Sequence, residues 1–260
     1  MTDTAGPVIE AGRPAIEAGG LALRIGGATI LDGIDLAAAP GELLGVIGPN
    51  GAGKTTLFNV LTGIVAPTAG RVRLAGVEVT GQPVHRRARA GLGRSFQTSS
   101  LFGELSVLEN VRIAAQSAQG RSLSVLARPR AGDRATATAR EQLAAVGLAD
   151  RADRTAAALS HGEQRKVEIA MLLAADPSVI LLDEPMAGVA SGDVAGLVEL
   201  IGAIHAQGRT VLMVEHHLDV VLELADRVAV LHHGRVLACA SPAEVMADPE
   251  VQRAYLGRAA

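Results

Sequence analysis

A glycine-rich loop near residue 50 carries the clearest chemistry in the chain. Residues Gly48 to Thr56 read GPNGAGKTT, directly after the apolar run ELLGVIG and directly before a segment with helical spacing. Glycines let a backbone wrap closely around phosphates, and the free N–H groups and dipole of a helix N-terminus attract their negative charge. In this pattern the lysine reaches the β- and γ-phosphates and the first threonine ligates Mg²⁺. The predicted nucleotide-binding residues are Gly48, Pro49, Asn50, Gly51, Ala52, Gly53, Lys54, Thr55 and Thr56.

Two adjacent acids follow a second apolar run. The segment VILLDEP places Asp183 and Glu184 at the carboxyl end of a strand, which is the edge where ligands bind in open α/β sheets. A buried strand tolerates two adjacent carboxylates only where something uses or solvates them. We expect Asp183 to hold Mg²⁺ and Glu184 to orient or deprotonate an attacking water. The alternative interpretation is an acid pair that caps a helix just past the strand.

A third segment, LSHGEQ from Leu159, combines a helix cap with a second place for a phosphate. Ser160 is a good N-cap, and Glu163 three residues later completes a capping box. Ser160 and Gly162 also form a helix N-terminus that can receive a phosphate. Because the cap uses only some of the free N–H groups, the two roles are compatible.

The elements that must position these residues follow from periodicity. Continuous apolar runs predict buried strands, and a regular alternation of strand and helix is typical of a parallel sheet covered by helices. From residue 160 onward the pattern reads helix, strand, helix, strand, over 160–175, 179–183, 193–207 and 210–215. Earlier in the chain we expect strands at 21–25 and 30–36, a helix at 55–61, and one half-exposed strand in RVRLAGVEV from Arg71.

Two segments depart from this pattern. Residues 1–18 are rich in Ala, Gly and Pro without periodicity, and we predict a flexible tail there. From about residue 98 to 158, Ala, Gln and Arg dominate, apolar residues recur at helical spacing, and strand patterns are absent. We predict an inserted helical subdomain over this range.

Composition excludes several classes of protein. The 260 residues carry a formal net charge of −3 and only 2% aromatic residues, so neither a basic surface nor base-stacking platforms argue for nucleic acid. No apolar run approaches the roughly 18 residues of a membrane span, and the acidic N-terminus does not resemble a signal peptide. The single cysteine, Cys239, lies in an apolar run and is expected to fill core. It cannot form an internal disulfide, which suits a reducing cytoplasm.

The three segments follow one another in the chain at 48–56, 159–164 and 179–185, with the predicted helical insert between the first and the second. In this arrangement they resemble the ATPase subunits of ABC transporters over residues 19–258. The resemblance implies an α/β P-loop NTPase fold, the ABC ATPase cassette, with a parallel core sheet, an N-terminal antiparallel β subdomain and an inserted helical subdomain. In that family the signature motif of one subunit completes the ATP site of another, so two ATP molecules are held in a head-to-tail dimer. The matching signature residues here are Ser160, His161, Gly162, Glu163 and Gln164.

The resemblance also gives roles to two residues that would otherwise be ordinary. Gln97 matches the Q-loop glutamine, which touches Mg²⁺ and water and faces the membrane subunits. His216 matches the switch histidine, which contacts the γ-phosphate. Without the family pattern, Gln97 would be a solvated loop residue and His216 a helix cap. The implied catalytic residues are Glu184, His216 and Gln97, and the implied Mg²⁺ ligands are Thr55, Gln97 and Asp183.

A narrower resemblance rests on RSFQTSSLFGELSVLENV, LSHGEQRKVEIA, VEHHLDVV and PEVQRAYLG. These segments are similar to branched-chain amino-acid importers, and to the longer of their two ATPase subunits. The implied partners are a second ATPase subunit (sibling or self), two transmembrane permeases and, indirectly, a solute-binding protein. The implied location is the cytoplasmic face of the plasma (inner) membrane, reached through the permeases. Urea/amide importers and lipopolysaccharide exporters look closely related, and the same motifs would also suit a non-transport ABC ATPase or, in part, a P-loop kinase.

Several positions depart from the family pattern. Ile25 stands where many members stack an aromatic residue on adenine, so we expect ATP-binding contact but loose base selectivity. Ala190 stands where the D-loop usually carries Asp or Asn, which puts cross-talk between the two ATP sites in doubt. His161 replaces a small glycine of the signature and is expected to point outward. The basic residues before Gln97 form either a docking surface for a permease loop or a solvated helix face, namely Arg86, Arg87, Arg89 and Arg94.

Overall fold

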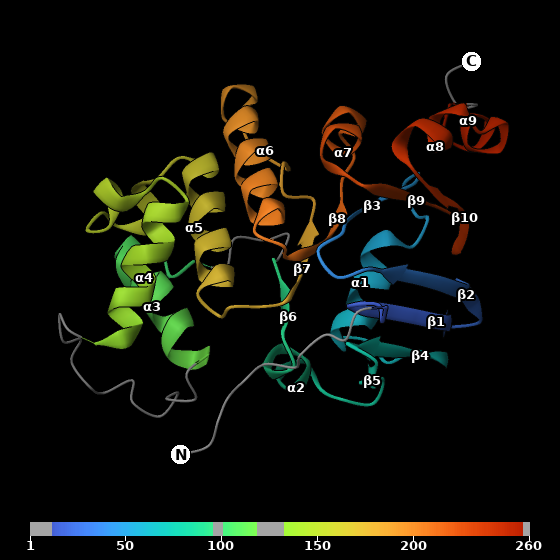
Figure 1. Cartoon of the computed structure of the whole chain (residues 1–260), viewed down its shortest axis with the longest axis horizontal. Helices are drawn as coiled ribbons and strands as arrows, with labels where there is room; N and C mark the ends of the chain where they lie inside the picture. Colours follow the sequence, from blue (N-terminus) through green and yellow to red (C-terminus); the bar gives the residue numbers. More distant parts are fainter. Residues whose placement is uncertain (1–11, 96–100, 119–132, 257–260) are drawn as a thin grey trace. The chain divides into compact units, whose positions relative to one another are not determined.

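The computed structural model describes residues 12–95, 101–118 and 133–256 (Figure 1). The chain folds as two compact units, each with its own layers. Among the described residues, unit 1 comprises 12–94, 178–184 and 201–256, and unit 2 comprises the remainder.

Unit 1 is built around a six-stranded sheet in the order β10-β9-β3-β8-β7-β6. All neighbouring pairs are parallel except β9 and β10. Every residue of β3, β7 and β8 is buried, as their continuous apolar runs predict. Parallel strands bring their carboxyl ends to one edge, and that edge carries the chemistry described below. The strands are β3 (Leu43–Ile47), β6 (Leu92–Arg94), β7 (Val179–Asp183), β8 (Thr210–Val214), β9 (Arg227–His232) and β10 (Arg235–Ala240).

A four-stranded antiparallel sheet completes the strands of unit 1, in the order β2-β1-β4-β5. Its strands are β1 (Ile16–Ile25), β2 (Ala28–Ala38), β4 (Ala69–Leu74) and β5 (Val77–Glu78). The tail boundary expected at residue 18 therefore lies inside β1. Ile16 and Ala18 are buried on either side of half-exposed Glu17, an alternation that small Ala and Gly residues conceal in the sequence.

The segment RVRLAGVEV is a hairpin rather than the single strand expected from its alternation. Ala75 and Gly76 have φ angles of 48° and 81°, and positive φ at both central residues is what a type I′ turn requires. The turn lets β5 pair back onto β4, with Leu74 opposite Val77. Periodicity is the same on both sides of such a turn, so it could not reveal the reversal.

The helices of unit 1 cover its sheets. The apolar side of α1 (Lys54–Thr62) supplies Leu57, Phe58 and Leu61 to the core. Cys239 of β10 packs against this core, as predicted, and burial raises the pKa of its thiol. The other helices are α2 (Val84–Arg89), α7 (Leu218–Leu224), α8 (Pro242–Ala247) and α9 (Pro249–Leu256), and α6 (Ser191–Ala206) runs from unit 2 into unit 1.

Unit 2 is helical in the described residues. Figure 1 shows α3 (Val107–Ala118), α4 (Arg134–Ala145) and α5 (His161–Leu173) packed against one another. Two short 3₁₀ turns, η2 (Ala149–Arg151) and η3 (Ala156–Ala158), precede α5. The unit extends beyond the expected insert of 98–158, because α5 packs its buried face on α3 and α4. Helical spacing shows that a helix has an apolar face but not what that face packs against.

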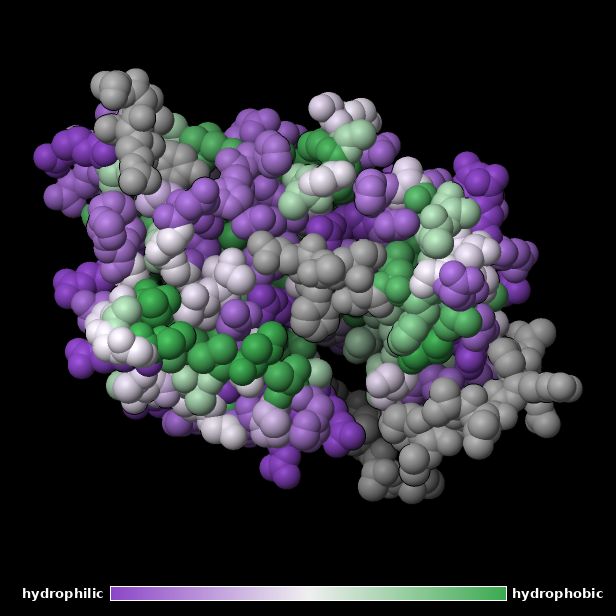
Figure 2. All heavy atoms as spheres, turned by 180° about the vertical axis from the view of Figure 1, so that it is seen from behind, coloured by the Kyte–Doolittle hydropathy of each residue, from purple (hydrophilic) through white to green (hydrophobic). Residues whose placement is uncertain are grey.

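No helix in the described parts of the chain is long and apolar enough to cross a membrane. On the face drawn in Figure 2, apolar side chains form separate patches among hydrophilic ones.

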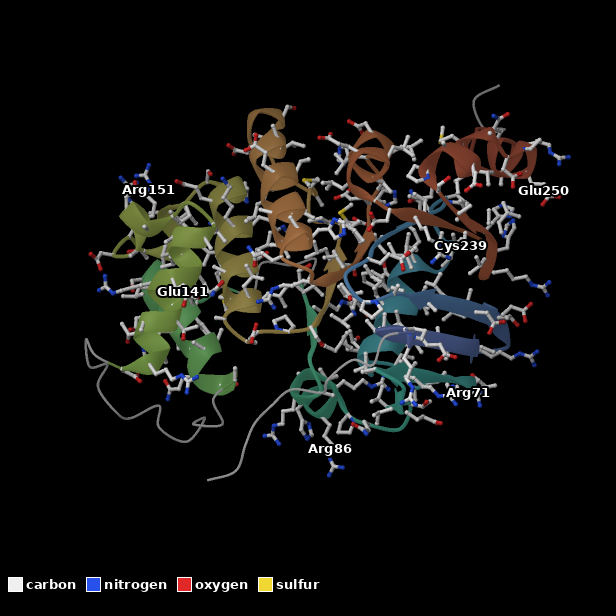
Figure 3. The ribbon with its side chains drawn as sticks, in the orientation of Figure 1. Arg71, Arg86, Glu141, Arg151, Cys239 and Glu250 are labelled. Atoms are coloured by element: carbon white, nitrogen blue, oxygen red, sulfur yellow. The ribbon has the colours of Figure 1, made fainter. Side chains whose placement is uncertain are left out.

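The basic cluster expected to be a surface is partly buried. Arg86 and Arg89 are exposed, and Figure 3 shows Arg86 extending away from α2, but Arg87 is only 1% exposed. The Arg87 guanidinium donates to the carbonyls of Val60 and Leu61 (2.7 Å each) at the end of α1, and to those of Thr80 and Gln82. Carbonyls at a helix C-terminus attract positive charge. Arg87 therefore caps the helix that begins at the phosphate loop.

We expect Arg87→Met to lower the free energy of unfolding by about 2–3 kcal/mol, because several buried carbonyls lose their donor. The exposed neighbour gives a matched control, since Arg86→Met should change stability by less than about 0.5 kcal/mol. Chemical denaturation of the two variants measures both. Equal stability of Arg87→Met and the parent would contradict the capping role.

Candidate functional site

The phosphate loop joins β3 to α1 in unit 1. A side chain at Gly48 is impossible, because its Cβ would lie 2.2 Å from the Leu231 carbonyl oxygen. Gly53 is the N-cap of α1, and no described side chain caps this helix end. The first N–H groups of α1 therefore point into the loop without a side-chain acceptor, which is the arrangement that suits an anionic ligand.

Lys54 spans the loop from its buried position at the start of α1. Its Nζ donates to the carbonyl of Gly48 at 2.6 Å and to that of Pro49 at 3.2 Å. Burial lowers the pKa of Lys54, and the nearby carboxylates of Glu184 and Asp183 act in the opposite direction. The loop and the acid pair are thus close enough to interact electrostatically.

Asp183 is fully buried at the carboxyl end of β7. Its Oδ2 accepts a hydrogen bond from Nη2 of Arg94 at 2.6 Å. Burial raises the pKa of Asp183, while the hydrogen bond and positive charge of Arg94 lower it. Arg94 stands at the end of the neighbouring strand β6, so a residue expected on the surface is a direct partner of the predicted metal ligand.

Glu184 has a φ angle of 49°, which is uncommon for a residue other than glycine and marks a constrained backbone. Its N–H donates to the Val214 carbonyl of β8 at 2.9 Å. Its Oε1 lies 2.9 Å from Nε2 of His216, which follows β8. The structure therefore brings together two residues that the family resemblance assigned to the same reaction.

Glu215 organises the segment after β8, a role that sequence reasoning did not give it. Its carboxylate is 1% exposed, and Oε2 accepts from the N–H groups of His216 (2.9 Å) and His217 (3.3 Å). The same oxygen lies 3.1 Å from Nδ1 of His217. A glutamate directly after an apolar strand is the only sequence signal for it.

The signature segment lies in unit 2 at the start of α5. The predicted capping box is confirmed: Ser160 Oγ accepts from the Glu163 N–H at 3.2 Å, and Glu163 Oε2 accepts from the Ser160 N–H at 2.9 Å. Ser160 and His161 are exposed, whereas Gly162 is buried. Gln164 directs its amide Nε2 to the carbonyls of Ala156 and Leu159, at 3.4 and 3.3 Å.

Two of the remaining predicted positions are exposed in the structure, and a third lies outside the described residues. Ile25 is 58% exposed at the end of β1, which leaves its apolar side chain available for contact. Ala190 is exposed in the turn before α6, where its carbonyl accepts from the Asp193 N–H. Gln97 lies outside the described residues.

A family model described as "ABC transporter" matches residues 31–187, a range that includes the phosphate loop, the signature segment and the acid pair. The chain belongs to the ABC transporter family. A second model, described as "Branched-chain amino acid ATP-binding cassette transporter", matches residues 235–260. The predicted fold class, an ABC ATPase cassette, is confirmed.

Individual relatives agree with this membership. The high-affinity branched-chain amino acid transport ATP-binding protein LivG of Escherichia coli (strain K12) is 38% identical over 235 residues, or 88% of this chain and 92% of LivG. The lipopolysaccharide export system ATP-binding protein LptB of Acidithiobacillus ferridurans is 38% identical over 224 residues, 86% and 89% of the two chains. A solved ATP-binding cassette of an ABC transporter in its ADP conformation matches with a TM-score of 0.84 at 29% identity, covering 94% and 99%.

Proposed function

We propose that this ABC family member hydrolyses ATP to ADP and phosphate and drives an importer for branched-chain or other hydrophobic amino acids. The match of residues 235–260 to the branched-chain family model carries the amino-acid part of the proposal, because that segment lies outside the ATPase motifs. The 38% identity to LivG supports it. Because the identity to LptB is equally 38%, overall sequence identity alone does not identify the transported molecule.

The phosphate loop and the acid pair suit ATP with Mg²⁺. Thr55 and Asp183 offer a hydroxyl and a carboxylate, the hard oxygen ligands that Mg²⁺ prefers. Within the described residues no group of three His, Cys, Asp or Glu could form a complete metal site. Mg²⁺ usually takes one or two protein ligands and fills its shell with phosphate oxygens and water. When bound, the ion neutralises charge on the phosphates.

The remaining groups act on the γ-phosphate and the water. In our proposal the loop amides and Lys54 neutralise phosphate charge, and Glu184 orients or deprotonates the attacking water. His216 would hold Glu184 through its 2.9 Å contact. Contact with the γ-phosphate is the role that the family resemblance gives it. Gln97 acts on the ion and the water, a role taken from the family resemblance alone.

We further propose that the ATP site is completed by a second ATPase subunit, either a copy or a sibling. The exposed Ser160 and His161 at the start of α5 support this, because they are accessible to a partner. Two permeases would hold this pair at the cytoplasmic face of the inner membrane, with a solute-binding protein acting indirectly. Closing on ATP and opening after hydrolysis would then alternate the access of the permeases.

Uptake assays in cells that lack this chain test the proposal. We expect loss of leucine, isoleucine and valine uptake, restored by the parent chain but not by Lys54→Ala, because Lys54 neutralises phosphate charge. Normal uptake of these amino acids together with a loss of urea uptake or of lipopolysaccharide export would overturn the cargo assignment. Co-purification with ribosomes instead of permeases would overturn the transport role.

A further inference from the structure

Arg94 joins three elements around a buried guanidinium. Its side chain is 9% exposed, and Nη2 donates to Asp183 Oδ2 of β7 at 2.6 Å. Nη1 donates to Asn59 Oδ1 at 2.7 Å and to Thr62 Oγ1 at 3.3 Å, both on α1. The guanidinium carbon also lies 5.9 Å from the centre of the Phe58 ring. Nothing in the proposed reaction yet uses this residue.

Arg94 and Asp183 both lie next to points where the chain passes from unit 1 into unit 2. Arg94 is the last residue of unit 1 before the first of these points, and Asp183 is the last but one before the second. The two residues lie at the ends of adjacent parallel strands. The pair therefore fixes the strand ends at which the proposed cation ligand stands.

We propose that Arg94 is a positioning residue that shares the Asp183 carboxylate with the bound divalent cation and so weakens the hold of the site on that cation. This rests on the proposed function, which assigns Asp183 to Mg²⁺. Two positive groups on one carboxylate repel each other, and the repulsion is strong where water is excluded. A weaker hold favours release of the cation after each round of hydrolysis.

The Arg94 guanidinium is anchored, so its repulsion of the cation remains when the cation is bound. A lysine on a flexible stem could swing away when a cation arrives, but a planar guanidinium held by several partners keeps its place. Asn59, Thr62 and Phe58 hold Arg94 from α1, the same helix that begins at Lys54 and Thr55. Arg94 thus remains a fixed positive charge beside the cation.

Binding of Mn²⁺ to the full chain, followed by electron paramagnetic resonance in the presence of ADP, tests this proposal. Arg94→Met keeps a long apolar side chain over Phe58 but removes the charge, and we expect the Kd for Mn²⁺ to fall about tenfold or more. Arg94→Lys keeps the charge but lacks the planar, anchored guanidinium, so its Kd should fall by a smaller factor than that of Arg94→Met. The exposed Arg89 provides the matched control, since Arg89→Met should leave Mn²⁺ binding unchanged.

Unchanged or weaker Mn²⁺ binding in a folded Arg94→Met variant would overturn the proposal and leave Arg94 a structural residue. If Arg94→Met does not fold, Asn59→Ala loosens one anchor instead. Its Kd should also fall, by a smaller factor, and no fall overturns the proposal equally. Asp183→Asn tests the assignment of Asp183 to the cation separately from the role of Arg94. If Asp183→Asn binds Mn²⁺ as the parent does, that assignment fails, whatever the Arg94 variants show.

Discussion

Replacing Glu184 by glutamine is expected to reduce steady-state ATP hydrolysis by at least about a hundredfold while ATP stays bound. The amide keeps the size of the side chain and can still bond to His216, which lies 2.9 Å from the carboxylate. It cannot accept a proton from the attacking water. The phosphate loop is untouched, so nucleotide binding should persist and the pair of subunits should remain closed on ATP.

Phosphate release and equilibrium binding of a fluorescent ATP analogue, measured on the same preparation, separate these effects. Glu223→Gln is the matched control, because Glu223 is an exposed acid on α7 and loses the same charge. Its hydrolysis should equal that of the parent. A near-parental rate in Glu184→Gln would falsify the role given to Glu184.

The parts of the site that could be predicted are those whose chemistry is local in sequence. The phosphate loop needs glycines, a lysine and a hydroxyl within nine residues. A continuous apolar run predicts the strand before it, and helical spacing predicts the helix after it. The Ser160 capping box is equally local, because both of its hydrogen bonds lie within one turn of a helix. Such features depend only on residues that are neighbours in the chain, so they can be predicted from the sequence without knowing the tertiary structure.

The parts that could not be predicted depend on distant partners. Arg94 and Asp183 are separated by 89 residues, and nothing near Arg94 in sequence distinguishes it from the exposed Arg89. Arg87 likewise finds its carbonyl acceptors on α1, more than 20 residues earlier. A run of arginines is typical of a solvated face, and only tertiary packing shows which members are buried.

The predicted end of the tail at residue 18 and the predicted end of the helical insert at residue 158 were wrong for a related reason. The start of β1 is hidden because Ala and Gly are small enough to be buried or exposed without a visible pattern. The helical unit extends past residue 158 because α5 packs on α3 and α4, and its helical spacing does not show whether its apolar face meets a helix or a sheet. For β1 and for α5 alike, the sequence predicts the kind of element, but it does not predict the surface that the element packs against.

Substitution of Gly162 by alanine is the second change expected to have a large effect. A Cβ at this buried position would lie 2.6 Å from Oδ2 of Asp193, 2.8 Å from its Cβ and 2.9 Å from its Cγ. Asp193 stands in the first turn of α6, so relieving the overlap must displace the start of α5 or of α6. Overpacking of this kind costs about 1–3 kcal/mol. A shift of about 1 Å in the signature segment should lower ATP hydrolysis about a hundredfold.

Second-site changes at Asp193 test this steric cause directly. Asp193→Gly removes all three overlapping atoms and should restore stability and hydrolysis in the Gly162→Ala background to the level of Asp193→Gly alone. Asp193→Ala leaves its Cβ 2.8 Å away and should restore them only in part. Gly196→Ala is the control on α6, because its Cβ would meet only the flexible end of Lys166 at 3.4 Å. Equal rescue by glycine and alanine at 193, or none by either, would show that Gly162 is required for a reason other than this overlap.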